Sequence, residues 1–154
     1  MSGRRGTLLQ KELTMTGDGE RGHTGAVVYI DRSEIREGRA DELRTGVSNL
    51  VDFVDAHEPQ LIAYAFHVDE KAGEMTVIAV HPDSASLELH VEVAGGEFRK
   101  RAHLVTLREI RIYGRPSDRA LALLQQKAEM LGEGVSVRVH EPDAGFAHCL
   151  PTPA

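Results

Sequence analysis

Two apolar, strand-like segments separated by only five residues constrain the fold of this chain more than any other feature. Residues 61–69 and 75–81 have the composition of strands, and the Glu-Lys-Ala-Gly-Glu stretch at 70–74 is polar and contains a glycine. A short polar loop of this kind between two strand-like runs is typical of a β-hairpin. With the turn at the centre of this loop, we expect His67 to lie opposite Val77.

A helix is expected on each side of this hairpin. Before it, apolar residues recur with the 3.6-residue spacing of a helix that ends before Pro59. These are Leu43, Val47, Leu50, Val51 and Val54. After the hairpin, Pro82-Asp83-Ser84 offers caps for a second helix. We expect this helix to break at Gly95-Gly96, which could alternatively be a gating hinge, and to resume over residues 98–105.

The order of elements predicts the fold class. A first strand at 26–30 and a fourth at 107–113 complete the order strand, helix, strand, strand, helix, strand. This order is the ferredoxin-like pattern, an α+β fold with an antiparallel sheet and both helices on one face. A third helix, capped by Ser117 or Asp118 and closed by Gly132, is expected to follow. Alternating valines at 135–139 predict a fifth strand, which either widens the sheet or crosses to a partner subunit.

Three regions follow from this pattern. Residues 1–25 lack periodicity and are expected to be a flexible arm, within which Met15 offers an alternative start. Residues 26–114 contain the ferredoxin-like domain. Residues 115–154 are expected to extend the same domain with a helix and a strand.

Charge and composition exclude several classes of protein. The 154 residues fit one domain, and the net charge of −6 argues against a nucleic-acid partner. The longest apolar run, residues 61–66, is too short to span a membrane, and the single Cys149 cannot form an internal disulfide. We therefore expect a soluble cytoplasmic protein with no membrane partner.

The first strand is expected to present apolar side chains on both faces of the sheet. Val27 and Tyr29 alternate with Val28 and Ile30. Because helices cover only one face, the other face needs a second cover, and a homodimer with two sheets face to face is the simplest one.

The strand and helix after the hairpin carry a family resemblance. Residues 76–84, Thr-Val-Ile-Ala-Val-His-Pro-Asp-Ser, followed by Ser-Leu-Glu-Leu-His-Val at 86–91 and by Phe98, resemble antibiotic-biosynthesis-monooxygenase-like domains. The resemblance covers residues 24–114 and implies a dimeric α+β barrel with a cavity between the sheet and the helices of each subunit. It implies a cofactor-independent monooxygenase acting on a small aromatic or polyketide-type substrate. The alternatives are a non-catalytic dimeric ligand-binding or scaffold protein of the same fold, and a haem-binding relative.

The same resemblance directs attention to three residues. In the haem-degrading branch, an Asn on the first strand corresponds to Asp31, a Trp on the second helix to His90, and a nearby His to His103. A neutral imidazole at His90 can take a phenolic proton at neutral pH, so His90 is the expected catalytic base. Asp31, expected at the end of the first strand, can orient His90 or a substrate hydroxyl. The alternatives are a structural helix histidine and a solvated strand-end carboxylate.

The remaining candidates are substrate-binding residues. Tyr64 and Phe66 alternate with small residues and can line a pocket for a flat apolar ligand, or else belong to the core. His103 is the third candidate for contact with a ligand. No metal site is expected, because the histidines do not have a recognised ligand spacing.

Overall fold

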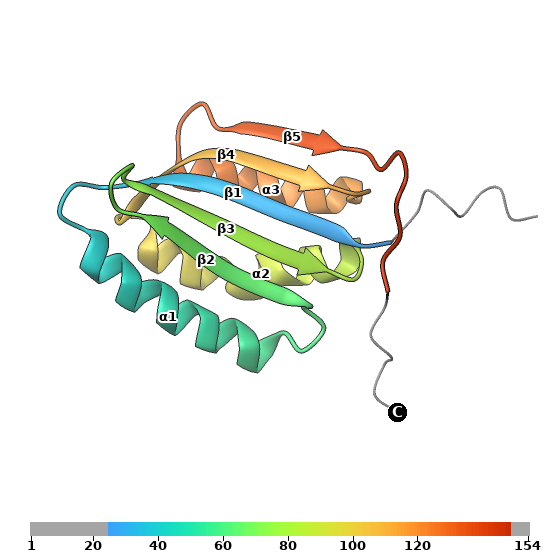
Figure 1. Ribbon diagram of the computed structural model, residues 1–154, viewed down its shortest axis with the longest axis horizontal. Coiled ribbons are helices and arrows are strands. Elements are labelled where there is room, and N and C mark those ends of the chain that lie inside the picture. Colours follow the sequence, from blue (N-terminus) through green and yellow to red (C-terminus); the bar gives the residue numbers. More distant parts are fainter. Residues whose placement is uncertain (1–24, 149–154) are drawn as a thin grey trace, which may run out of the picture.

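The computed structural model describes residues 25–148, which form a five-stranded sheet and three helices (Figure 1). The elements in chain order are β1 (Val27–Ile35), α1 (Ala40–His57), β2 (Ala63–Asp69), β3 (Glu74–His81), α2 (Ser84–Arg101), β4 (Val105–Tyr113), α3 (Asp118–Leu131) and β5 (Ser136–His140). The expected flexible arm lies outside the described residues apart from Gly25, and so does Cys149. Among the described helices, none has the length and apolar character needed to cross a lipid bilayer.

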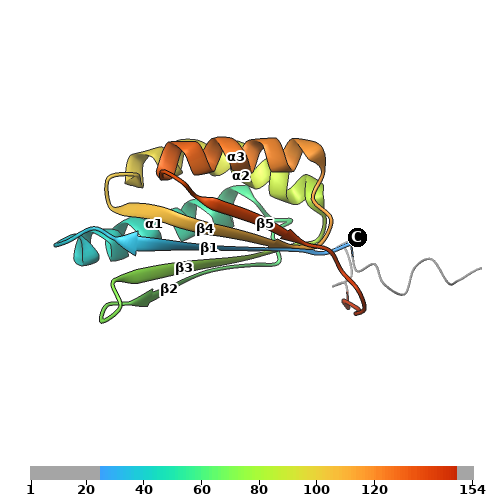
Figure 2. The same cartoon turned by 90° about the horizontal axis from the view of Figure 1, so that it is seen from above.

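The strands form one open sheet in the order β2-β3-β1-β4-β5. The first four strands pair antiparallel, and this confirms the predicted α+β ferredoxin-like arrangement. β5 pairs parallel to β4 after the crossover through α3, so the fifth strand widens the sheet of its own chain. Figures 1 and 2 show all three helices on one face of this sheet.

Alternation along the strands decides which side chains face the helices. In β1, Val27, Tyr29, Asp31 and Ser33 are buried toward the helices, and the residues between them are more exposed. β3 alternates in the same way. The core therefore lies between one face of the sheet and the apolar stripes of the helices. On α1 this stripe buries Leu43, Leu50 and Val54, as its spacing predicts.

Two differences from the sequence-based prediction change the position of site residues. β1 continues to Ile35, so Asp31 lies in the middle of the strand and not at its end. α2 runs without a break through Gly95-Gly96 and ends at Arg101. Each glycine disfavours the helix by about 1 kcal/mol, but burial of neighbouring apolar side chains outweighs this local preference. These side chains are Leu87, Val91, Ala94 and Phe98.

The hairpin register also differs by one residue. Asp69 pairs with Glu74, so the loop contains four residues, and His67 lies opposite Thr76 instead of Val77. Because strand side chains alternate between faces, this register places His67 on the open face, whereas His81 is fully buried toward the helices.

Candidate active site

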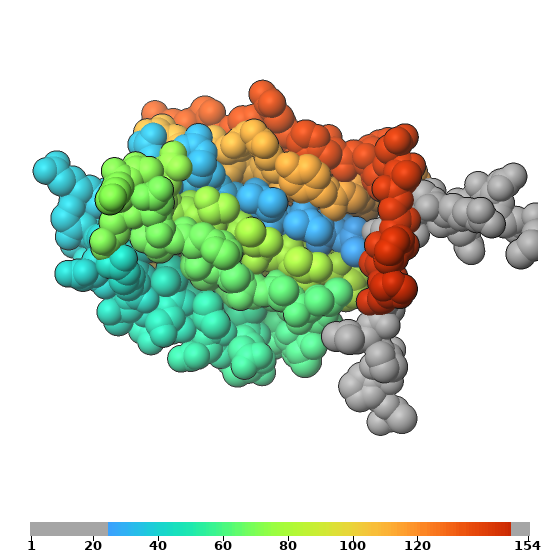
Figure 3. All heavy atoms as spheres, in the orientation of Figure 1, coloured from blue at the N-terminus to red at the C-terminus, as the bar shows by residue number. Residues whose placement is uncertain are grey.

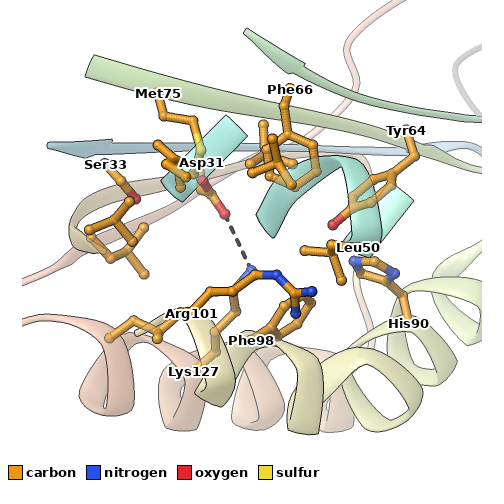
Figure 4. Close-up of a pocket in the computed structure, with 16 residues that line it drawn as sticks. Asp31, Ser33, Leu50, Tyr64, Phe66, Met75, His90, Phe98, Arg101 and Lys127 are labelled. Carbon is orange, nitrogen blue, oxygen red and sulfur yellow. Dashed lines mark hydrogen bonds and ion pairs between the residues drawn. The ribbon is translucent and has the colours of Figure 1, made fainter. Parts of the chain in front are cut away.

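A cavity of about 50 Å³ lies between the sheet and the helices (Figure 4). Four of the five residues expected at the site contribute to its wall, although they come from β1, β2 and α2. They are Asp31, Tyr64, Phe66 and His90. Arg101 of α2 and Lys127 of α3 also line it, so the cavity combines an apolar wall with a few charged groups.

His90 is buried in the cavity wall and is held by a carboxylate. Its side chain is 2% exposed, and Nδ1 lies 2.9 and 3.0 Å from the two carboxylate oxygens of Glu58, which is fully buried. When Nδ1–H donates to Glu58, the lone pair of the neutral imidazole is on Nε2. The ring also packs against Tyr64, at 5.1 Å, and Phe98, at 5.5 Å between centroids. This buried pair has the arrangement of an oriented general base.

A second histidine, His81, lies close to His90 but is not among the residues that line the cavity. The His81 ring centroid is 5.5 Å from that of His90, and its Nδ1 is 2.8 Å from the Ser86 hydroxyl oxygen. Its Nε2 is buried and has no hydrogen-bond partner within residues 25–148. Burial, together with the proximity of His90, lowers the pKa of His81 to about 3. His81 therefore remains neutral over the physiological range.

Asp31 pairs with Lys127, and the expectation that it orients His90 is wrong. The Tyr29 hydroxyl donates to Asp31 Oδ2 at 2.5 Å, and Lys127 Nζ donates to the same oxygen at 3.2 Å. Lys127 Nζ also donates to the Tyr29 hydroxyl oxygen at 2.8 Å. Burial first, and then the Asp31 charge, raises the pKa of Tyr29 well above its usual value, so Tyr29 stays protonated. The carboxylate that orients His90 is Glu58.

Lys127 reaches the cavity from α3, which lies outside the region of family resemblance. Its side chain is 7% exposed, and Nζ lies 4.2 Å from the centre of the Phe98 ring. A buried ammonium is stable only with partners, and here a carboxylate, a hydroxyl and an aromatic face supply them. The extension after residue 114 thus contributes a charged group to the cavity.

Arg101 is the second cation of the cavity wall. Its Nε donates to the Gly46 carbonyl at 2.6 Å, and its Nη1 donates to Glu97 Oε2 at 2.9 Å. Hydrogen bonds from Lys100 and then from Arg101 lower the pKa of Glu97. These contacts tie α1 to the last turn of α2 beside the cavity.

Tyr64 and Phe66 belong both to the cavity wall and to the core. Their rings pack edge to face at 5.2 Å, and both side chains are half-buried. Burial, followed by the charges of Asp31 and Glu58, raises the pKa of Tyr64. Its hydroxyl therefore stays protonated and is available as a hydrogen-bond donor. Figure 4 shows Tyr64 beside His90, away from the Asp31–Lys127 pair.

His103 does not reach the cavity. Its side chain is 52% exposed and its Nε2 lies 3.0 Å from Glu42 Oε1, so the expected ligand contact is absent from this arrangement. Because α2 ends at Arg101, His103 lies in the turn before β4, where Leu104 is the residue that is buried.

Three site residues, Arg101, Glu58 and Lys127, are absent from the sequence-based prediction, and a sequence signal was available for the last two. Each continues an apolar helical stripe, since Glu58 is four residues after Val54 and Lys127 is three residues after Leu124. A charged residue at a position that the periodicity assigns to the core requires a buried partner. The sequence therefore indicated that Glu58 and Lys127 would each have a buried partner.

Metal ligands do not gather at this cavity. Over residues 25–148, no three His, Cys, Asp or Glu side chains are placed so that they could hold a metal ion. The His90–Glu58 pair can transfer a proton, and the Tyr64 hydroxyl can donate a hydrogen bond to a ligand in the cavity.

Comparison with known proteins gives matches among solved structures. No protein-family model matches the sequence. No curated protein matches it significantly. MupZ from Pseudomonas fluorescens aligns with a TM-score of 0.62 and 14% identity, over 80% of this chain and 94% of MupZ. A conserved protein from Methanosarcina mazei Go1 aligns with a TM-score of 0.51 and 18% identity, over 60% of this chain and 93% of that protein.

A third match carries a described activity. SnoaB from Streptomyces nogalater, a cofactor-independent oxygenase, aligns with a TM-score of 0.50 and 16% identity, over 60% of this chain and 94% of SnoaB. The MupZ match covers a larger share of this chain than the other two. At identities this low, the structural matches establish a shared architecture and nothing more. This chain therefore has the fold of MupZ and of the oxygenase SnoaB, and the predicted resemblance to antibiotic-biosynthesis-monooxygenase-like domains is confirmed for the fold.

Proposed function

We propose that this chain is a cofactor-independent monooxygenase that acts on a small aromatic or polyketide-type molecule. The observation that carries the proposal is the buried His90–Glu58 pair in the wall of the cavity. The shared fold with SnoaB, which is described as a cofactor-independent oxygenase, is consistent with this chemistry. Fold alone does not determine function, and the residues of the site carry the proposal.

The proposed reaction begins with proton transfer to His90. Its Nε2 accepts the proton of a phenolic hydroxyl, and the Glu58 carboxylate stabilises the resulting imidazolium. The phenolate is electron-rich enough to reduce dioxygen directly. A CH₂ group conjugated to it becomes C=O, one oxygen atom enters the product, and the second leaves as water with the two hydrogens of that carbon.

The other polar groups have supporting roles in this proposal. Tyr64, which stays protonated, donates a hydrogen bond to a substrate oxygen beside His90. Asp31 is a positioning residue, because it holds the Lys127 ammonium in the wall. Phe66 forms part of the apolar surface against which the ring lies.

A homodimer belongs to the same proposal. Val28, Ile30, Ile78 and Val80 lie on the sheet face opposite the helices and are only half-buried in the single chain. Figure 3 shows this face, which the tail after β5 crosses at one end only. Burying these side chains against a second copy removes apolar surface from water, at about 25 cal/mol per Å².

The decisive experiment measures oxygen uptake with anthrone, whose enol form has a phenolic hydroxyl and whose CH₂ carbon becomes a C=O of anthraquinone, and follows incorporation of ¹⁸O from labelled dioxygen. His90→Ala is expected to lower the enzymatic rate by about 10²–10⁴-fold, the usual contribution of a general base. Glu58→Gln is expected to lower it less, because the amide still accepts a hydrogen bond but no longer stabilises the imidazolium. The matched control is His103→Ala, a surface histidine, which is expected to retain the rate. An unchanged rate in His90→Ala, or an unlabelled product, contradicts the proposal.

A non-catalytic ligand-binding protein is the second candidate. It is favoured by the state of Asp31 and Lys127, whose charges are already paired with each other. Binding of an aromatic ligand without any oxygen uptake by the unsubstituted protein would establish this candidate. The haem-binding alternative is not favoured, because His103 pairs with Glu42 at the surface.

A further inference from the structure

The two glycines of α2 leave a cleft between α2 and α3. The cleft has a volume of about 370 Å³ and lies along Gly95 and Gly96 on one helix and Leu123, Gln126 and Met130 on the other. A Cβ atom built on either glycine meets no atom within 4 Å. The cleft is therefore open because these two positions carry no side chain.

The cleft and the inner cavity share two lining residues, Phe98 and Lys127. Each is 7% exposed, and Lys127 Nζ lies over the Phe98 ring at 4.2 Å. Phe98 also packs against His90, at 5.5 Å between ring centroids. These two side chains thus form the wall between the cleft and the candidate base.

Neither space is complete as a site for an aromatic substrate. The inner cavity is about 50 Å³, whereas a cavity of about 150 Å³ is needed for benzene and ligand pockets are typically about 300–1,000 Å³. The cleft lies within that range but lacks His90 among its lining residues. A Lys stem and a Phe ring can change rotamer without a change in the backbone, so this wall can be displaced.

We propose that the α2–α3 cleft and the inner cavity form one binding site, with Phe98 and Lys127 as the movable wall between them. The ligand is a small, flat aromatic molecule with hydroxyl or carbonyl oxygens. Its body lies in the cleft, an oxygen contacts Lys127, and the reacting end faces His90. The assignment of His90 as the reacting end rests on the proposed function.

The chemistry of the wall selects this class of ligand. Phe98, Leu123 and Met130 offer apolar and polarisable contacts for a ring. An ammonium group has three hydrogens to donate. Asp31 and the Tyr29 hydroxyl accept from Lys127 Nζ, which leaves one hydrogen for an oxygen of the ligand.

A competing entrance lies on the other side of the domain. A recess of about 140 Å³ between α1 and β2 includes Val51, Glu58 and Tyr64 in its lining. Tyr64 also lines the inner cavity, so a ligand could approach His90 from this side. The experiment must therefore block each route separately.

The test is an anaerobic fluorescence titration of the full chain with 1-naphthol. Gly95→Leu and Gly96→Leu fill the cleft with a side chain that favours the helix more than glycine does, so folding is retained. Each is expected to raise the Kd by at least about tenfold, which corresponds to about 1.4 kcal/mol of binding free energy. The corresponding alanine variants are expected to have smaller effects, because they fill less of the cleft. Ala85→Leu, which adds the same side chain at an exposed position of α2 outside the cleft, is the matched control and is expected to leave the Kd unchanged.

The outcomes separate this inference from the proposed function. An unchanged Kd in both leucine variants overturns the inference, as does a failure of the unsubstituted protein to bind 1-naphthol. A Kd that rises in Val51→Phe but not in the glycine variants places the route at the α1–β2 recess and also overturns it. Weaker binding in the glycine variants supports the inference even if the protein consumes no oxygen. Loss of oxygen uptake in His90→Ala supports the proposed function even if the cleft variants bind normally.

Discussion

His81 links the stability of the fold to pH in a way that can be measured directly. It is fully buried, and its pKa of about 3 in the folded protein is below the value of about 6.5 that an unfolded chain has. Between these two values the unfolded state binds a proton that the folded state does not. The free energy of unfolding is therefore lost as the pH falls below 6.5, and the loss continues until the pH approaches 3.

The size of this effect follows from the two pKa values. At pH 5 the protonated form of this imidazole outnumbers the neutral form about thirtyfold in the unfolded chain. The free energy of unfolding is therefore about 2 kcal/mol lower than at neutral pH. By pH 3 the loss from this one group reaches about 4 kcal/mol, since each pKa unit corresponds to about 1.4 kcal/mol and the folded state itself is half protonated at this pH. A domain with a typical stability of about 5–15 kcal/mol would lose a measurable fraction at pH 5.

The assay compares urea unfolding of the unsubstituted protein and of His81→Phe at pH 7, 6 and 5, at one protein concentration. The phenylalanine ring keeps the planar shape but cannot take a proton, so the free energy of unfolding of the variant is expected to fall by about 2 kcal/mol less between pH 7 and 5. His103→Ala, which removes an exposed histidine, is expected to behave like the unsubstituted protein. Parallel pH dependences for the unsubstituted protein and His81→Phe would refute the reasoning.

Three further predictions concern α2, the buried ion pair and the open face of the sheet. Gly95→Ala is expected to stabilise the fold by about 1 kcal/mol, because the position is helical and the added Cβ meets no atom; an unchanged or lower Tm would contradict this. Lys127→Met is expected to cost about 3–5 kcal/mol in urea unfolding, because it leaves Asp31 buried without its partner. The double variant with Asp31→Asn should recover part of this loss, and no recovery would mean that the ion pair is not the cause. Ile30→Lys is expected to convert the proposed dimer to a monomer in light scattering, and a monomeric unsubstituted protein would rule out the dimer.

The order of elements was predictable because strands and helices have different local periods. Alternation in β1 and β3, and the 3.6-residue stripe of α1, are properties of short segments. Gly95-Gly96 led to a wrong prediction of a helix break because the helix propensity of glycine is also a local property. The glycines weaken the helix locally, but the contacts that hold α2 together come from other elements, where Phe98 packs against side chains such as Leu50 and Val54 of α1.

The candidate site was predictable in part. Asp31, Tyr64, Phe66 and His90 all line one cavity. The family resemblance had pointed to Asp31 and His90, and alternation with small residues had pointed to Tyr64 and Phe66. His103 was misplaced, since its position depended on where α2 ends. That end is set by the packing of Leu104 and the start of β4.

The amino-acid sequence by itself determined the α+β fold class and the succession of elements, because these depend on propensities and periodicities within short segments. Only the tertiary structure decided that Glu58 orients His90 and that Lys127 neutralises Asp31. These partners are separated by 32 and 96 positions in the chain. A hydrogen bond or ion pair depends on a few ångströms of distance between such segments, and no local pattern encodes that distance.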